Sequence, residues 1–181
     1  MLFRSDTKEM TRHELRDRFG MVLQDAWLFE GSIRDNIAYA QDNLPEEKII
    51  AAARSASVDS FIKTLPGGYD FELSTGAENI SQGQRQLLTI ARAMASDPEI
   101  MILDEATSNV DTHTEQLIQK ALAKLMHGRT SFVIAHRLST IRDADMILYM
   151  EHGDILEHGS HEELMAQHGK YEALYMSQFA Q

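Results

Sequence analysis

Short apolar runs alternate along the chain with longer, periodically apolar segments. The segments 19–23, 99–103 and 130–135, each built around consecutive apolar residues, predict buried strands. Strands of a parallel sheet that is covered on both faces read as continuous hydrophobic runs. Two later runs, at 146–150 and 154–157, lie either side of a glycine turn and predict a hairpin.

Helix signals fill the segments between these strands. Ser81 can cap a helix that Asp97-Pro98 stops, because the residue before proline avoids the helical conformation. Thr112 with Glu115 forms a capping-box pattern for the next helix. The predicted helices span about 45–56, 82–96, 112–127, a stretch that Ser160 with Glu163 caps, and 170–179. Strands that alternate with helices predict an α/β fold with a largely parallel sheet.

Composition limits the classes of protein that the chain can belong to. Its 181 residues suffice for one domain with a core and are too few for two ordinary domains. The formal net charge of −11 disfavours nonspecific binding to nucleic acid and to anionic lipid. The absence of cysteine excludes disulfides and thiolate metal sites, and it is compatible with a reducing cytosol.

The sequence offers no membrane segment of its own. No apolar run approaches the roughly 20 residues that span a bilayer. The residues after Met1 turn polar at once, so no signal peptide is visible. We therefore expect any membrane role to run through a partner or a missing segment.

Polar residues stand at the ends of the three predicted parallel strands. Gln24 follows the first strand, Asp104-Glu105 the second and His136 the third. Ligands of parallel α/β sheets bind beyond the carboxyl ends of the strands. The convergence of these residues is the first indication of a functional site.

The acidic pair at the end of the second strand has two interpretations. Asp104 can hold Mg²⁺, usually through the water shell of the ion, and Glu105 can orient or deprotonate an attacking water. A solvated acidic turn explains the same two residues. For this string alone the acidic turn is favoured, because short motifs often arise by chance.

The segment Ser81-Gln82-Gly83-Gln84 stands where a helix begins. Helix N-termini attract phosphate through backbone N–H groups and the helix dipole. Ser81 adds a hydroxyl donor, and Gly83 lets an anion approach the backbone closely. An ordinary N-cap with a polar first turn is the alternative. His136 can likewise contact a terminal phosphate or serve a structural role.

In order and spacing, these segments resemble the motifs of the ATP-binding cassette (ABC) family. Residues 79–86 resemble the ABC signature, and residues 102–108 resemble a Walker B strand with its catalytic glutamate. Residues 109–111 are similar to the D-loop, 134–140 to the switch-histidine loop, and 22–25 to the Q-loop. The ordered set makes a chance match very improbable.

The resemblance implies a fold and a division of the chain. The expected fold is a P-loop NTPase-like, largely parallel sheet flanked by helices, with an inserted α-helical subdomain. Residues 1–181 would form part of one ABC ATPase domain. The helical subdomain that carries the signature is expected at about 25–97, and the catalytic core at 1–24 and 98–181.

The resemblance also implies ATP and Mg²⁺ as ligands, and hydrolysis of ATP to ADP and phosphate as the activity. Asp104 would hold Mg²⁺ together with Gln24, and Glu105 would polarise the attacking water. Gln24 and His136 would complete the shell around the γ-phosphate.

The signature is expected to bind the nucleotide of a partner domain across a dimer. The expected nucleotide-binding residues are Ser81, Gln82, Gly83 and Gln84 of the signature and Asp111 of the D-loop. The family signature usually reads L-S-G-G-Q, and here Gln82 replaces the first glycine. Ser81 and Gly83, the pair that faces the phosphate in the family, remain. We therefore expect a functional signature.

The phosphate-binding loop of the family is missing from the sequence. No G-x-x-x-x-G-K-[ST] pattern occurs in it, and in the family this Walker A loop lies upstream of the Q-loop. The resemblance therefore predicts a chain truncated at its N-terminus and inactive by itself. A natural short protein is the alternative.

Residues 27–37 resemble the segment after the Q-loop in multidrug and lipid exporters. Trp27 and Phe29 would be exposed contacts for the membrane domain, or core residues of the helical subdomain; both interpretations stay open. The implied partners are a second nucleotide-binding domain, identical or related, and a transmembrane domain fused upstream, with no nucleic acid. The implied location is the cytoplasmic face of the inner membrane.

Two other functions compete with an exporter motor. A soluble ABC-type ATPase of DNA maintenance or translation would need coiled-coil heptads or a basic arm, and the sequence shows neither. The other competing function is that of a noncatalytic fragment, which only donates a signature loop to an intact partner. ATP binding by the chain alone would separate the motor from the fragment.

Overall fold

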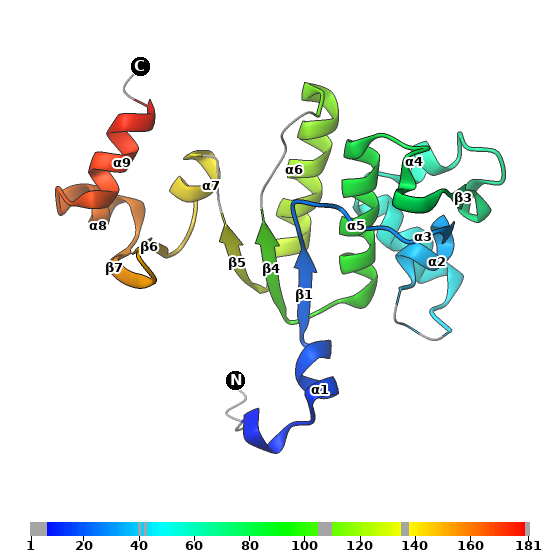
Figure 1. Ribbon diagram of the computed structural model, residues 1–181, viewed down its shortest axis with the longest axis horizontal. Helices are drawn as coiled ribbons and strands as arrows, with labels where there is room; N and C mark the ends of the chain where they lie inside the picture. The colour runs from blue at the N-terminus through cyan, green and yellow to red at the C-terminus, as the bar shows by residue number, and fades with distance from the viewer. Residues whose placement is uncertain (1–6, 40, 42, 105–109, 135–137, 180–181) are drawn as a thin grey trace. The chain divides into compact units, whose positions relative to one another are not determined.

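The computed structural model describes residues 7–39, 41, 43–104, 110–134 and 138–179. The contacts within the chain divide it into two compact units, residues 1–134 and 135–181. Each unit has its own strands and helices (Figure 1).

The first unit is built on a three-stranded parallel sheet. Its order is β1 (Phe19–Val22), β4 (Ile100–Asp104), β5 (Thr130–Ile134). Val22 lies opposite Leu103, and Asp104 lies opposite Ile134. Because the strands run in one direction, their carboxyl ends share one edge of the sheet. The predicted α/β class with a largely parallel sheet is confirmed.

Two long helices cover one face of this sheet (Figure 1). They are α5 (Gln82–Ser96) and α6 (Thr112–Met126). On β4 the alternate residues Met101 and Leu103 are buried with them, as the two-residue period of a strand requires. The buried helix residues in this core include Leu87, Leu88, Ile90, Ile118 and Leu125.

The opposite face of the sheet departs from the sequence prediction of strands buried on both sides. Phe19 and Met21 on β1 and Phe132 and Ile134 on β5 are exposed. An apolar run indicates that both faces of a strand are apolar, but whether both are covered depends on what packs against them. Within the part of this unit that the structure describes, only the face toward α5 and α6 is covered.

A group of shorter helices lies on the far side of α5 (Figure 1). Helices α2 (Ile33–Ile37) and α3 (Glu46–Ser55) pack on α5, and α4 (Asp59–Ile62) packs on α3. Strands β2 (Gly31–Ser32) and β3 (Glu72–Leu73) form a small antiparallel sheet. The remaining helical turns of this unit are η1 (Thr7–Glu9), α1 (Arg12–Asp17), η2 (Gly68–Asp70) and η3 (Thr75–Ala77).

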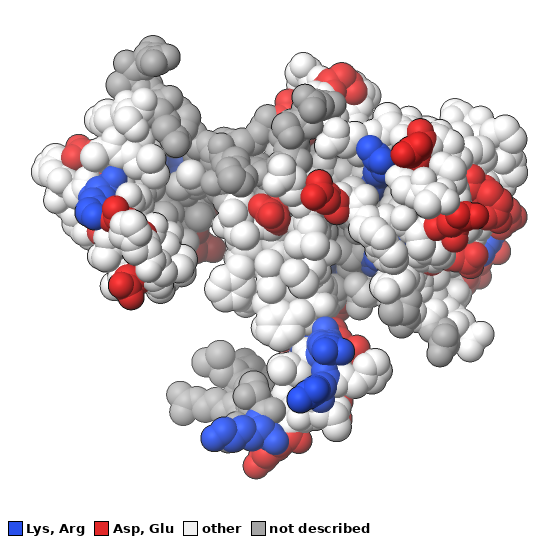
Figure 2. Space-filling model, viewed as in Figure 1, with Lys and Arg blue, Asp and Glu red and all other residues white. Residues whose placement is uncertain are grey.

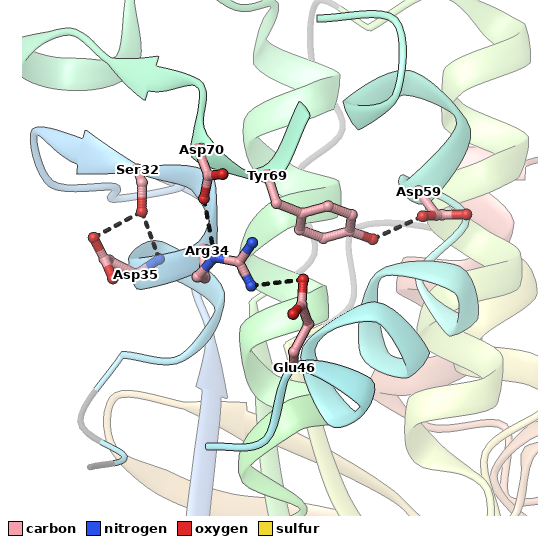
Figure 3. A network of polar contacts seen from close by, with 7 residues as sticks. All are labelled: Ser32, Arg34, Asp35, Glu46, Asp59, Tyr69 and Asp70. Atoms are coloured by element: carbon pink, nitrogen blue, oxygen red, sulfur yellow. Dashed lines mark hydrogen bonds and ion pairs between the residues drawn. The ribbon is translucent and has the colours of Figure 1, made fainter. Parts of the chain in front are cut away.

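Polar contacts join the short helices to one another (Figure 3). Arg34 on α2 pairs with Glu46 of α3 and with Asp70 of η2, each at 3.0 Å. The Tyr69 hydroxyl donates to the Asp59 carboxylate of α4 at 2.7 Å. Burial is the main cause that raises the pKa of Tyr69, and the hydrogen bond to Asp59 adds to it.

Charge is unevenly distributed over the described surface. In Figure 2, Asp and Glu side chains gather over the region of α2–α4, whereas Lys and Arg side chains gather on α1. The basic residues of α1 share that helix with Glu14 and Asp17. This patch is therefore mixed in charge.

The second unit contains a hairpin and three helices within its described residues. Strands β6 (Ile147–Glu151) and β7 (Asp154–Gly159) pair antiparallel, as predicted. His152 and Gly153 both have positive φ, 54° and 91°, in the tight turn between them. The helices are α7 (Leu138–Arg142), α8 (His161–Ala166) and α9 (Lys170–Phe179).

Helix ends in the two units test the predicted caps. Ser81 caps α5, and Ser160 with Glu163 forms a capping box on α8, as predicted. The prediction that Thr112 caps α6 is wrong, because Asp111 is the N-cap and its carboxylate accepts from two backbone N–H groups. An Asp one residue upstream offers the better acceptor. The predicted division into subdomains at 25–97 and its flanks stays a prediction.

Candidate functional site

The carboxyl edge of the parallel sheet brings two of the predicted site residues to one place. Asp104 is the last residue of β4, and Gln24 lies two residues beyond Val22, the last residue of β1. Gln24 is exposed, and Asp104 is half-buried. The predicted Glu105 and His136 lie outside the described residues.

The N-termini of both long helices lie toward the same edge. Helix α5 leads within four residues into β4, and α6 leads likewise into β5, so each helix runs antiparallel to the strand that follows it. Figure 1 shows both helices beginning beyond the carboxyl ends of the arrows. Their N-caps, Ser81 and Asp111, therefore lie on the side toward which the carboxyl ends of the strands point. Helix N-termini attract anions, which makes this edge suited to phosphate.

Ser81 and Gln84 form a capping box at the start of α5. The Gln84 N–H donates to Ser81 Oγ at 3.3 Å, and the Ser81 N–H donates to Gln84 Oε1 at 2.9 Å. A serine hydroxyl that accepts one bond keeps its own hydrogen to donate. Ser81 is exposed, so this hydrogen can reach a ligand outside the helix. Gln82 is half-buried.

Gly83 is buried, although the sequence suggested that it leaves room for an anion. A Cβ at this position would lie inside van der Waals contact with Thr114 Cγ2 and 3.0 Å from Val110 Cγ1. The structure thus adds a packing reason for glycine to the predicted one.

Asp111 joins the site to the start of α6. Its Oδ1 accepts from the His113 N–H at 3.1 Å and from the Thr114 N–H at 3.0 Å. The backbone bond from Thr114 is the largest cause of its lowered pKa, followed by the Thr114 side-chain bond. The carboxylate therefore stays ionised and fixed at the helix end.

The donor atoms at this edge fit a hard cation such as Mg²⁺. This ion prefers oxygen ligands, retains several waters and binds proteins through one or two carboxylates together with substrate phosphates. Asp104 supplies a carboxylate and Gln24 an amide oxygen. In the described part of the chain, no three His, Asp or Glu residues are grouped as an all-protein metal cage.

An aromatic group lies between the end of β1 and α5. The ring centroids of Trp27, Phe29 and Tyr39 lie about 6 Å from one another, at 5.8–6.1 Å. Trp27 is 59% exposed and Phe29 is half-buried. Two interpretations were open for these residues, exposed contact or core residue. Trp27 fits the exposed one, and Phe29 fits neither fully.

Arg92 of α5 holds this aromatic group in place. It donates to the Trp27 carbonyl at 3.0 Å, to the Asn36 carbonyl at 2.8 Å and to Asn36 Oδ1 at 3.1 Å. Its guanidinium carbon lies 4.9 Å from the Tyr39 ring centroid and 5.8 Å from that of Trp27. Burial lowers the pKa of Arg92.

Sequence reasoning missed Arg92, Thr114 and the capping role of Asp111. The capping role could have been found, because Asp111 directly precedes the helical pattern and aspartate is a preferred N-cap. Arg92 and Thr114 gave no signal, since each acts on residues far away in the sequence or through side-chain packing.

A parallel sheet with helix N-termini directed at its carboxyl edge is the arrangement of nucleotide-binding α/β proteins. Comparison with known protein families agrees, since the family described as ABC transporter matches residues 2–108. The chain belongs to the ABC transporter family. The resemblance seen in the motifs is thereby confirmed.

Individual relatives are similar to this chain over nearly its whole length. An uncharacterized ABC transporter ATP-binding protein, YfiC of Bacillus subtilis, is 53% identical over 97% of this chain and 29% of its own length. An ATP-dependent lipid A-core flippase of Desulfotalea psychrophila is 49% identical over 96% of this chain and 30% of its own. The structure of a bacterial Atm1-family ABC exporter with ATP bound superposes with a TM-score of 0.86 and 40% identity, covering 98% of this chain and 31% of that one.

The chain spans less than a third of the length of these relatives. Names of the relatives such as flippase and exporter describe export-type ABC transporters, so the similarity of this chain to the exporter branch is confirmed as well. Across the described ranges, no helix combines the length and the apolar character needed to cross a bilayer.

Proposed function

We propose that this chain is part of the ATP-hydrolysing motor of an ABC exporter. The observation that carries the proposal is the carboxyl edge with Gln24 and Asp104, toward whose side the N-termini of α5 and α6 are directed, in the order of the family motifs. The match to an exporter structure with ATP bound supports it. ATP-driven pairing of two such domains would drive export of a substrate across the membrane.

Each predicted site residue has a proposed task. Asp104 and Gln24 would hold Mg²⁺, which neutralises charge on the phosphates. Glu105 would polarise the attacking water, and His136 would contact the γ-phosphate. The turn of Ser81, Gln82, Gly83 and Gln84, with Asp111, would bind the nucleotide held by the partner domain.

The proposed partners are a second nucleotide-binding domain and a membrane domain. Relatives named ATP-binding/permease proteins support the second partner, for example the fatty acid ABC transporter of Mycobacterium bovis, which is 54% identical over 92% of this chain. Exposed Trp27 and Tyr39 offer an apolar surface for that contact. The domain would then work at the cytoplasmic face of the membrane.

A second candidate function is that of a noncatalytic signature donor. It is supported by the signature itself, since Ser81 and Gly83 would serve the nucleotide of a partner whether or not this chain hydrolyses ATP. Such a chain would complete the nucleotide site of an intact partner through Ser81 and Gly83 without hydrolysing ATP itself.

The proposed motor is tested by Glu105→Gln in a chimaera. In the chimaera this segment replaces the matching part of the Bacillus subtilis relative, so that a complete ATPase carries it. The substitution keeps the size of the side chain but removes the charge that polarises water. We expect hydrolysis to fall by about 100-fold or more, with ATP binding unchanged.

The control for this test is Glu99→Gln, which changes an exposed glutamate at the opposite end of β4. It should leave turnover near that of the parent chimaera. Near-normal turnover of Glu105→Gln would rule out the proposed role of Glu105.

A further inference from the structure

The start of α5 and the start of α6 touch at a point that leaves no room for a side chain. Gly83 is the second residue of α5 and is buried. A Cβ placed on it would overlap Thr114 Cγ2 and would lie 3.4 Å from Thr114 Cβ and 3.0 Å from Val110 Cγ1. Glycine costs conformational entropy in a helix, so its presence here calls for a reason, and this contact supplies one.

The two sides of the Thr114 side chain face different parts of the site. Its methyl group is the atom nearest to the position that a Cβ on Gly83 would take. Its backbone N–H donates to Asp111 Oδ1 at 3.0 Å, and its side chain helps to lower the pKa of Asp111. Thr114 therefore contacts both the N-cap of α6 and the buried glycine of α5.

We propose that Thr114 is a positioning residue that sets the spacing between the turn Ser81–Gln84 and Asp111. On this view residue 83 is glycine because the Thr114 methyl needs the space of a side chain, apart from any approach of a ligand. The contact between Thr114 and residue 83 follows from the geometry alone. Its consequence for ATP-driven pairing of domains rests on the proposed function.

The steric part is tested by rescue in the 181-residue chain. Gly83→Ala should lower Tm by about 3–10 °C, because overpacking forces helices apart. Adding Thr114→Ser removes only the methyl and keeps the hydroxyl, so it should restore most of the lost Tm. Thr112→Ser removes a methyl from an exposed residue of the same helix and should restore nothing.

The hydroxyl part has a spectroscopic readout. Thr114→Val keeps a methyl against Gly83 but cannot donate to Asp111. The carboxyl carbon of Asp111, followed by NMR against pH, should therefore titrate at higher pH in Thr114→Val than in the parent chain. In Thr114→Ser it should titrate as in the parent.

The consequence for function is tested in the chimaera with the Bacillus subtilis relative. ATP-dependent association of the domains should weaken several-fold in Gly83→Ala and recover in Gly83→Ala/Thr114→Ser. Recovery of Tm without recovery of association would overturn the positioning role and assign Gly83 to ligand approach. An unchanged Tm in Gly83→Ala, or rescue by Thr112→Ser, would overturn the packing itself. Absence of ATP-dependent association in the parent chimaera would instead overturn the proposed function.

Discussion

Ser81 serves the helix and, in our proposal, the ligand with the same side chain. As N-cap it accepts from Gln84, and its exposed hydroxyl keeps one hydrogen to donate. A phosphate oxygen is a strong acceptor for that hydrogen. Replacing Ser81 by alanine removes both the cap and the proposed contact to the ligand. A control variant that loses a similar cap elsewhere is therefore needed to distinguish the two effects.

We predict that Ser81→Ala in the chimaera weakens the ATP-bound dimer by about 1.5–3 kcal/mol, the cost of one hydrogen bond to a charged group. Binding of ATP to the open monomer should change little. Sedimentation in a hydrolysis-deficient background measures the dimer. Ser81→Thr should behave like the parent, and Ser160→Ala should lose a similar cap on α8 without affecting the dimer. Equal dimer affinity of Ser81→Ala and parent would contradict the signature role.

Arg92 is the residue through which α5 holds the aromatic group. Lysine keeps the charge but cannot donate from a planar fork to the Trp27 and Asn36 carbonyls together. We predict that Arg92→Lys shifts the fluorescence of Trp27 toward longer wavelength, as its ring becomes more exposed. Trp27 is the one tryptophan of the sequence, so the emission reports this site alone. An unshifted spectrum would show that Arg92 does not position the ring; Arg85→Lys, elsewhere on α5, is the control.

At the scale of elements, the short helices are held to one another by ion pairs and hydrogen bonds as well as by apolar contacts. Asp59 shows this best, since its side chain is only 14% exposed and binds Lys63 at 2.8 Å and the Tyr69 hydroxyl at 2.7 Å. It thereby joins α4 to the turn at η2. The hydrogen bond from Lys63 is the largest cause that lowers the pKa of Asp59, opposed by burial and aided by Tyr69.

We predict that Asp59→Asn destabilises the chain by about 1–3 kcal/mol at neutral pH, since a charge-assisted pair is lost. A carboxyl whose folded pKa is lowered stabilises above its unfolded pKa of about 3.9, and this stabilisation is lost as pH falls through the folded value. The stabilities of parent and variant should therefore converge in acid. Urea unfolding at neutral and acidic pH measures both stabilities. Asp70→Asn is a milder control, because the Asp70 side chain is 72% exposed. A difference that persists unchanged in acid would contradict the charge argument.

At the scale of the whole molecule, the described residues provide part of a nucleotide site. In our proposal, Asp104 and Gln24 contact the ion of this chain's own site, whereas the N-termini of α5 and α6 serve the nucleotide of the partner domain. A run of backbone donors and a lysine normally neutralise the β- and γ-phosphates, and the sequence lacks the motif that supplies them. Phe132 and Ile134 are exposed on the open sheet face, and we expect them to favour self-association.

We therefore predict that the 181-residue chain does not bind Mg-ATP with useful affinity by itself. Titration calorimetry of the purified chain should show no saturable heat at micromolar ATP. The chimaera, which has a phosphate-binding loop, should bind under the same conditions and serves as the positive control. Saturable micromolar binding by the chain alone would mean that another of its segments holds the phosphates.

The sequence alone determined the elements and the family. Apolar runs predicted the strands β1, β4 and β5. Ser81 and Ser160 predicted the helices that follow them, and the ordered motifs indicated the ABC family. These signals are local, because a strand period, a cap or a motif is complete within a few neighbouring residues.

Only the tertiary structure decided which apolar positions are covered and which distant residues meet. It left Phe19 and Phe132 exposed on strands expected to be buried on both faces. It seated Arg92 against Trp27, and Thr114 against Gly83. The physical reason is that burial and close packing belong to pairs of surfaces. A sequence specifies each surface, but it does not state which other surface will lie against it.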